Sequence, residues 1–271
     1  MAEIIFKNKN IFYRAEGKGK AVMLLHGFGE DGEVWQPQFE YLKKDYFVMV
    51  PDLPGSGRSQ MLEGTCTIGD YAEVVKAIVE KELGSHSEDN PATFTLIGHS
   101  MGGYITLAFA GKYPDQLHSF GLFHSSAYAD TEEKIKTRKK AIAFIKENGA
   151  EPFLKTSVPD LFSKTTREKR PDLIEKLLTI ANRISGDALI QYYEAMIQRP
   201  DTTDVLRSFP NPVLFLIGKQ DPVIPLQASL EQSHLPSICS IHILPHSGHV
   251  GMWEEESLSN TCLADFLKAF A

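Results

Sequence analysis

Apolar runs of strand length recur along the chain and alternate with segments of helical periodicity. Four of the early runs predict strands largely buried on both faces of a sheet, at 21–25, 46–50, 92–97 and 120–124. Helical patterns separate them, most clearly at 68–83, where apolar residues fall at 71, 74, 75, 78, 79 and 83. This alternation predicts an α/β fold whose parallel strands are joined by right-handed crossovers.

Further elements extend this sheet at both ends of the chain. Two short strands, 3–7 and 9–15, predict an initial hairpin, and the polar segment 84–91 predicts a loop. Later runs at 213–217 and 240–244 predict two more strands, the last with the alternation of an edge strand. An amphipathic helix is expected over about 257–270.

The alternation stops between about 127 and 207, where strand-like runs give way to helical patterns. The predicted helices are 132–148, 151–154, 159–162, 170–184 and 186–198. Their charge runs are typical of solvated helix faces. Helices inserted between two strands of one sheet predict a cap over its carboxyl edge. We therefore expect a core formed by 1–126 and 208–271, with 127–207 as an all-helical cap.

Composition narrows the class of protein. The chain has 271 residues, 42% hydrophobic content and a net charge of −7, which argues against a nucleic-acid-binding protein. Its start lacks a basic segment followed by a long apolar run, and no run approaches a membrane span, so neither is predicted. Cys66, Cys239 and Cys262 lack metal-ligand spacing. Free thiols in a reducing compartment are expected, which predicts a cytoplasmic location.

The segment 98–102 reads Gly-x-Ser-x-Gly and lies between a predicted strand and a predicted helix. Five residues with two glycines recur by chance, so this position is what gives the pattern its meaning. A serine in such a tight connection adopts a strained backbone and needs small neighbours. The segment therefore predicts a nucleophile elbow that presents the Ser100 hydroxyl at the top of the sheet.

An acid and a base follow later strands. Asp221 comes after the strand at 213–217 and His249 after the last strand, so both should lie with Ser100 at the carboxyl edge, where open α/β sheets bind ligands. His249 would take the serine proton, and Asp221 would orient its ring. The backbone N–H groups of Phe28 and Met101 are the candidate oxyanion hole.

Four segments together resemble the signatures of the α/β-hydrolase fold superfamily. They are His26-Gly27-Phe28-Gly29, Gly98-His99-Ser100-Met101-Gly102-Gly103, Gly218-Lys219-Gln220-Asp221 and Gly248-His249. The loop 52–59 is also similar. The resemblance implies a mostly parallel central sheet flanked by helices, with a serine nucleophile. The cap and length resemble the branch of carboxylesterases, enol-lactonases and carbon–carbon bond hydrolases.

Other polar residues near these segments have simpler interpretations. His246 is the one rival base, but Gly248 before His249 matches the family pattern. His26 is expected to brace the oxyanion loop, Asp52 to structure its own loop, and His99 to pack. Some relatives place the acid after the strand preceding the cap, where this chain has no carboxylate until Asp130.

The expected activity is hydrolysis of a carboxylic ester, lactone or thioester through an acyl-serine intermediate. A serine at the elbow argues against haloalkane dehalogenases and epoxide hydrolases, and the triad chemistry requires no metal or organic cofactor. The expected partner is a small-molecule substrate, and no oligomeric state is indicated. A carbon–carbon hydrolase or a slow-turnover ligand receptor on this fold stays open. Candidate acyl-pocket residues in the cap are Phe144, Phe153, Phe162, Tyr192, Tyr193 and Met196.

Overall fold

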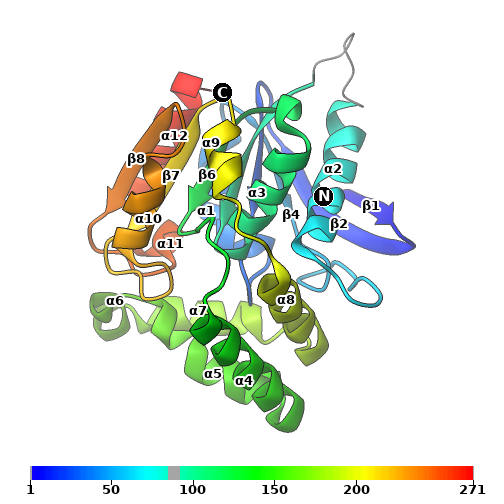
Figure 1. Ribbon diagram of the computed structural model, residues 1–271, viewed down its shortest axis with the longest axis vertical. Coiled ribbons are helices and arrows are strands. Elements are labelled where there is room, and N and C mark those ends of the chain that lie inside the picture. Colours follow the sequence, from blue (N-terminus) through cyan, green and yellow to red (C-terminus); the bar gives the residue numbers. More distant parts are fainter. Residues whose placement is uncertain (1, 85–91, 271) are drawn as a thin grey trace.

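The computed structural model describes residues 2–84 and 92–270 and confirms the α/β fold (Figure 1). The described residues form one eight-stranded sheet in the order β1-β2-β4-β3-β5-β6-β7-β8. The predicted loop lies, apart from Gly84, outside the described residues. The strands are β1 (Ala2–Phe6), β2 (Lys9–Glu16), β3 (Ala21–Leu25), β4 (Phe47–Pro51), β5 (Phe94–His99), β6 (Leu117–Phe123), β7 (Val213–Gly218) and β8 (Cys239–Leu244).

The sheet is mostly parallel, as predicted. The initial hairpin β1–β2 is antiparallel and adds to β4 in an antiparallel register, and every pairing from β4 across to β8 is parallel. β8 occupies the edge that its alternating pattern predicts. Because β3, β5, β6, β7 and β8 run the same way, the loops after them gather at one edge of the sheet.

Helices cover both faces of the sheet, and an apolar core lies on each side. One core is formed with α2 (Ile68–Leu83) and α3 (Met101–Lys112), the other with α1 (Gln36–Leu42) and α12 (Glu256–Phe270). The predicted bounds of α2 are confirmed, and Thr67 and Asp70 close its first turn as a capping box. The remaining core helices are η1 (Gly32–Trp35), η2 (Pro114–Gln116), α10 (Leu226–Ser233) and α11 (Gly251–Glu254).

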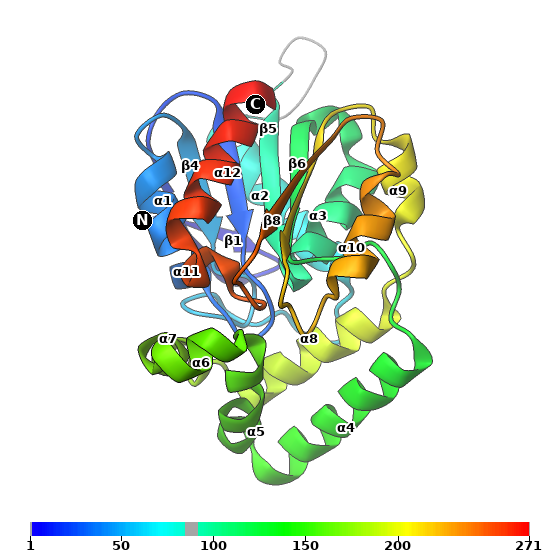
Figure 2. The same ribbon diagram turned by 90° about the vertical axis from the view of Figure 1, so that its left-hand side faces the viewer.

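Between β6 and β7 the chain forms only helices and loops, and all of this segment is described. The helices α4 to α8 lie together beyond the carboxyl ends of the strands (Figure 2). The short helices α6 and α9 were not predicted, because six residues are too few to show periodicity. The helices are α4 (Glu132–Asn148), α5 (Ala150–Ser157), η3 (Pro159–Leu161), α6 (Lys164–Lys169), α7 (Pro171–Ala181), α8 (Gly186–Gln198) and α9 (Thr203–Ser208).

Polar contacts from α8 join these helices to the loop after β4. The buried Tyr192 donates its hydroxyl to the Pro54 carbonyl at 2.8 Å. Gln191 donates to the carbonyls of Leu62 at 3.0 Å and Gly64 at 2.8 Å. Buried polar groups are costly unless they are paired, so these bonds define one seating of α8 on the sheet.

No helix among the described residues combines the length and apolar character that a bilayer crossing requires. All three cysteines are free, as expected: Cys66 and Cys262 are buried and Cys239 is half-buried. Burial raises the pKa of the Cys239 and Cys262 thiols to about 11, so these two side chains behave as small apolar groups rather than as thiolates.

Candidate active site

Ser100 lies in a tight connection between β5 and α3. Its φ of 50° and ψ of −114° place it in a sparsely populated backbone region. The backbone segments around Ser100 lie too close together for larger residues. A Cβ added at Gly98 would lie 2.2 Å from the Gly102 carbonyl carbon, and one at Gly102 would lie 2.6 Å from the Leu25 oxygen. The local geometry is that of a nucleophile elbow.

The structure brings the three predicted side chains into one hydrogen-bonded chain. The Nε2 atom of His249 lies 2.9 Å from the Ser100 hydroxyl, and its Nδ1 lies 2.8 Å from Oδ2 of Asp221. The other carboxylate oxygen of Asp221 accepts the backbone N–H groups of Val223 and Ile224 at 2.8 and 2.9 Å. The three residues follow β5, β7 and β8, so the parallel sheet accounts for their meeting.

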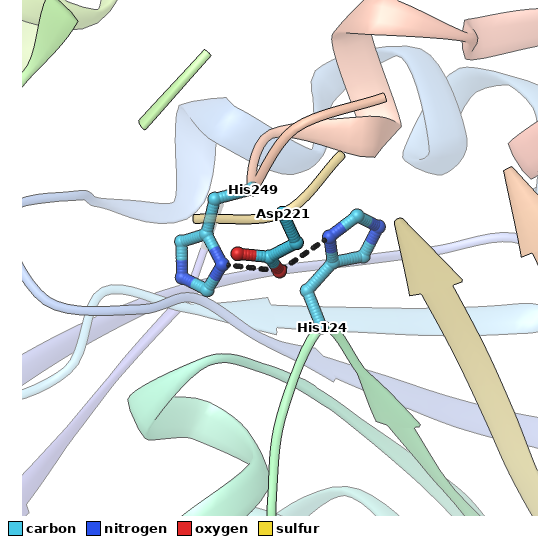
Figure 3. Close-up of side chains that lie close together, drawn as sticks. All are labelled: His124, Asp221 and His249. Atoms are coloured by element: carbon cyan, nitrogen blue, oxygen red, sulfur yellow. Dashed lines mark hydrogen bonds and ion pairs between the residues drawn. The ribbon is translucent and has the colours of Figure 1, made fainter. Parts of the chain in front are cut away.

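A second histidine binds the same carboxylate oxygen. His124 follows β6, and its Nδ1 lies 3.1 Å from Oδ2 of Asp221 (Figure 3). Since an ionised carboxylate only accepts hydrogen bonds, both histidines carry their proton on Nδ1. His249 then presents an unprotonated Nε2 to Ser100, which is the tautomer that a general base needs. The sequence signal for His124 is a polar residue at the end of a buried strand, and the sequence analysis predicts no role for it.

The His124 ring is enclosed on every side. Its side chain is fully buried, its φ is +49°, and its Nε2 has no hydrogen-bond partner among the described residues. A Cβ at Gly218 or at Gly251 would approach the ring to 2.5 Å, and the ring stacks on Phe123 at 4.9 Å. An unpaired buried nitrogen costs stability. The fold keeps this unpaired nitrogen on the ring whose Nδ1 is bonded to the Asp221 carboxylate.

Burial and hydrogen bonding have opposite effects on the pKa values of Asp221 and of His124, and a different effect dominates for each residue. Burial would raise the pKa of Asp221, but the two histidine N–H groups outweigh it and hold that pKa below its usual range. Burial dominates for His124 and, although Asp221 opposes it, lowers the pKa of that ring to about 4. The site therefore holds a carboxylate beside a neutral His124 at neutral pH.

His124, Asp221 and His249 also form the one group among the described residues whose ligand atoms are close enough for a metal ion, within 4.8 Å of one another. The hydrogen bonds already account for these atoms: each Nδ1 donates to the same Oδ2. A metal would require the Nδ1 lone pairs, which the protons occupy. The arrangement fits a hydrogen-bonded acid better than a ligand set.

A buried ion pair supports the elbow from below. Glu30 accepts the N–H of Gly27 at 2.6 Å and bonds Nδ1 of His99 at 2.9 Å, and Nε2 of His99 lies 2.8 Å from the His249 carbonyl. Both neighbours of His99 are acceptors, so the ring is held as an imidazolium. Burial lowers its pKa, but Glu30 outweighs burial and raises it. Glu30, which the sequence analysis did not single out, thus ties the Phe28 loop to the base.

The rival base His246 and the two loop residues His26 and Asp52 lie outside this network. His246 is exposed, and its backbone N–H donates to Glu255 at 2.8 Å. The Asp52 carboxylate accepts the backbone N–H groups of Gly32 and Arg58, each at 2.9 Å, and so structures its loop. His26 accepts the N–H of Leu53 at 2.9 Å, which braces the loop that carries Phe28.

A cavity of about 160 Å³ lies over Ser100 and His249, between the sheet edge and the cap helices. Phe28 lines it from the core, and Met101 begins α3, where the first N–H groups lack helical partners. Of the six cap residues expected at a pocket, Tyr193 and Met196 line the cavity. Phe162 and Tyr192 are instead buried in packing, Phe153 packs against the Phe28 and Tyr193 rings, and Phe144 is exposed. Other lining residues are Gly29, Glu30, His99, Tyr104, Arg138, Leu154, Ser157, Val158, Leu161, Leu177 and Val223.

Comparison with known proteins agrees with the fold. The family model described as alpha/beta hydrolase fold matches residues 20–256. The chain belongs to the α/β-hydrolase fold family, and it is a hydrolase.

Among solved structures, a thermophilic esterase from Thermogutta terrifontis, bound to malate, is similar over 99% of this chain and 98% of its own, with a TM-score of 0.91 and 26% identity. An (E)-2-((N-methylformamido)methylene)succinate hydrolase from Acinetobacter baylyi is 24% identical over 84% of this chain and 82% of its own. A pimeloyl-[acyl-carrier protein] methyl ester esterase from Legionella pneumophila is 23% identical over 96% of this chain and 100% of its own.

Replacing Gly102 by alanine should destabilise the elbow, because the added Cβ meets a backbone oxygen at 2.6 Å that cannot move alone. We expect a loss of about 2 kcal/mol or more, and a fall in melting temperature of roughly 5 °C. Gly69→Ala in α2 is the matched control: its Cβ would meet only Thr67 Oγ1 at 3.5 Å, so stability should hold or rise. Equal melting temperatures for the two variants would contradict the tight elbow.

The depressed pKa of His124 predicts a pH dependence of stability. The unfolded ring titrates near 6.5 and the folded ring near 4, so between these values only the unfolded chain takes up the proton. Stability from this group is present above pH 6.5 and is lost as pH falls toward 4, by an amount on the order of 3 kcal/mol.

His124→Asn removes the titrating ring and suits the positive φ. Urea unfolding of both proteins at several pH values should show the wild-type advantage shrinking from pH 6.5 to 4. Curves that stay parallel across this range would refute the buried neutral ring.

Proposed function

We propose that the protein hydrolyses a carboxylic ester, lactone or thioester through an acyl-serine intermediate. The observation that carries the proposal is the 2.9 Å contact between His249 Nε2 and the Ser100 hydroxyl at the floor of a cavity. An esterase of known structure that is similar over nearly the whole chain supports the same bond class. The substrate is a small molecule that enters between the core and the cap.

In the proposed first half-reaction, Ser100 Oγ attacks the carbonyl carbon while His249 Nε2 takes the hydroxyl proton. The tetrahedral oxyanion accepts hydrogen bonds from the backbone N–H groups of Phe28 and Met101. As the carbon–oxygen or carbon–sulfur bond breaks, His249 returns its proton to the leaving group. Water then attacks the acyl-serine by the same route and releases the acid.

Asp221 acts through His249 by holding the Nδ1 proton and stabilising the imidazolium. His124 is proposed as a positioning residue: it fixes Asp221 from the opposite side at 3.1 Å and, being neutral, leaves the charge of the carboxylate to His249.

We further propose the division of the chain into a core of 1–126 and 208–271 and a cap of 127–207. Helices α4, α5, α7 and α8 contribute cavity residues such as Leu154 and Tyr193, whereas α9 returns the chain beside α3. In this division the core supplies the reacting groups and the cap the walls.

Ser100→Ala should lower kcat/KM for p-nitrophenyl butyrate by about 10⁴-fold, because no other group replaces the nucleophile. A fluorophosphonate probe should label wild type at Ser100 and leave the variant unlabelled. A loss of less than tenfold, or labelling at another residue, would refute the serine mechanism. A wild-type enzyme that stops after one turnover would indicate a ligand receptor instead.

His249→Ala and His246→Ala form a matched pair three residues apart. The first should lose about 10³-fold or more of kcat, since the serine proton then has no acceptor. The second should keep activity within twofold, because the exposed His246 ring lies outside the network. The reverse pattern in a steady-state ester assay would transfer the base to His246.

A further inference from the structure

Two arginines share one buried carboxylate beside the cavity. Asp130, whose side chain is fully buried, accepts from Nε of Arg138 at 2.6 Å and pairs with Nη1 of Arg199 at 2.9 Å. The donors of Arg199 are further occupied by the carbonyls of Met196 and Tyr128, each at 2.9 Å. Both terminal nitrogens of Arg199 are therefore bonded within the protein.

The cluster carries one positive charge in excess. Two guanidinium groups face one carboxylate, and arginine does not give up its proton in proteins. The nearby Asp201 is exposed and forms no ion pair with either arginine among the described residues. Thr203 holds its carboxylate through its N–H and hydroxyl at 2.9 and 2.5 Å, and burial is outweighed by Thr203 and the charge of Arg199, which lower the pKa of Asp201. A buried charge without a partner destabilises the fold, so the excess positive charge favours binding of an anion here.

The excess charge faces the cavity through Arg138. This residue lines the same cavity as Ser100, with 13% of its side chain exposed, and among the described residues its Nη1 has no hydrogen-bond partner. Tyr104 lines the same wall, and its hydroxyl is likewise unpaired within the described part of the chain. The centre of the Tyr104 ring lies 3.8 Å from the Arg199 guanidinium. Tyr104 also interacts electrostatically with Arg138 and, with Asp130, raises the pKa of that arginine against the effect of burial.

The other charged groups of the cavity are neutralised where they stand. Glu30 is paired with His99, and Asp221, which lies behind His249, is not among the residues that line the cavity. The remaining wall is largely apolar, with Leu154, Val158 and Met196 among its residues. Arg138 is consequently the charged group with which an anion in this cavity can pair, and it offers one unit of positive charge.

We propose that Arg138 and Tyr104 form a carboxylate-binding subsite, and that the substrate is an ester carrying a second, ionised carboxylate. A carboxylate matches both the single excess charge and the planar donor fork of arginine, whereas a phosphate dianion would leave a negative charge uncompensated in an apolar cavity. This inference rests on the proposed ester hydrolysis at Ser100 and names its substrate class.

The test compares matched acidic and neutral esters. On the acyl side, monomethyl succinate, glutarate and adipate are paired with methyl butyrate, valerate and hexanoate; on the alcohol side, 4-acetoxybutyrate is paired with butyl acetate. Hydrolysis is followed by pH-stat. Wild type should show kcat/KM at least tenfold higher for the acidic member of at least one pair.

Arg138→Gln should abolish that preference, with most of the loss in KM, because the carboxylate is bound equally before and during the reaction. Neutral esters should change less than threefold. Lys139→Gln is the matched control: it removes the same charge from the next residue of α4, on an exposed position, and should keep the preference. Asp130 retains Arg199 in the variant, so the fold should survive.

A second readout does not depend on turnover of esters. Adipate should slow fluorophosphonate labelling of Ser100 in wild type and in Lys139→Gln, but not in Arg138→Gln. No acidic preference in any pair, or equal losses on both members in Arg138→Gln, would overturn the subsite while leaving ester hydrolysis intact. Absence of all hydrolysis and of labelling would instead overturn the function proposed for Ser100.

Discussion

The carboxylate of Asp221 is the group on which the rest of the site depends. Its Oδ2 atom accepts from His249 and His124 on opposite sides, while Oδ1 accepts two backbone N–H groups of its own loop. A buried carboxylate with four donors stays ionised and immobile. The two histidines therefore have their tautomers set by Asp221 rather than by solvent. Since His249 must expose an unprotonated Nε2, the acid determines whether the serine has a base at all.

This arrangement is maintained by close packing rather than by many polar contacts. Gly218 and Gly251 lie against the His124 ring, and Gly98 and Gly102 let α3 approach β5 and β3. The cost appears as strain: Ser100 and His124, two of the four non-glycine residues with positive φ in the described chain, lie at adjacent strand ends. Parallel strands deliver both residues to one edge, and packing of the two cores keeps them there.

Much of this could be predicted from the sequence, because the signals were local. Ser100, Asp221 and His249 each follow an apolar run, and the parallel order of the strands was enough to expect their meeting. The long helix α2 was predicted to its ends from its apolar periodicity, and the Thr67 capping box begins the helix at the same residue. His124 and Glu30 were not recognised, because their partners lie 97 and 69 residues away and nothing local marks them. The short helices α6 and α9 escaped for lack of a full period.

The cap and the core differ in how they handle charge, and this difference bears on selectivity. In the core, each buried charge of the site is compensated: Glu30 pairs with His99, and Asp221 accepts four N–H groups. At the junction with the cap, Asp130 serves two arginines, so the balance is left incomplete on the cavity wall. A complete balance suits groups that must hold their protonation through a reaction cycle. An incomplete balance suits recognition, because a substrate anion can supply the missing negative charge. The cost of desolvating the arginine is met in folding rather than at binding.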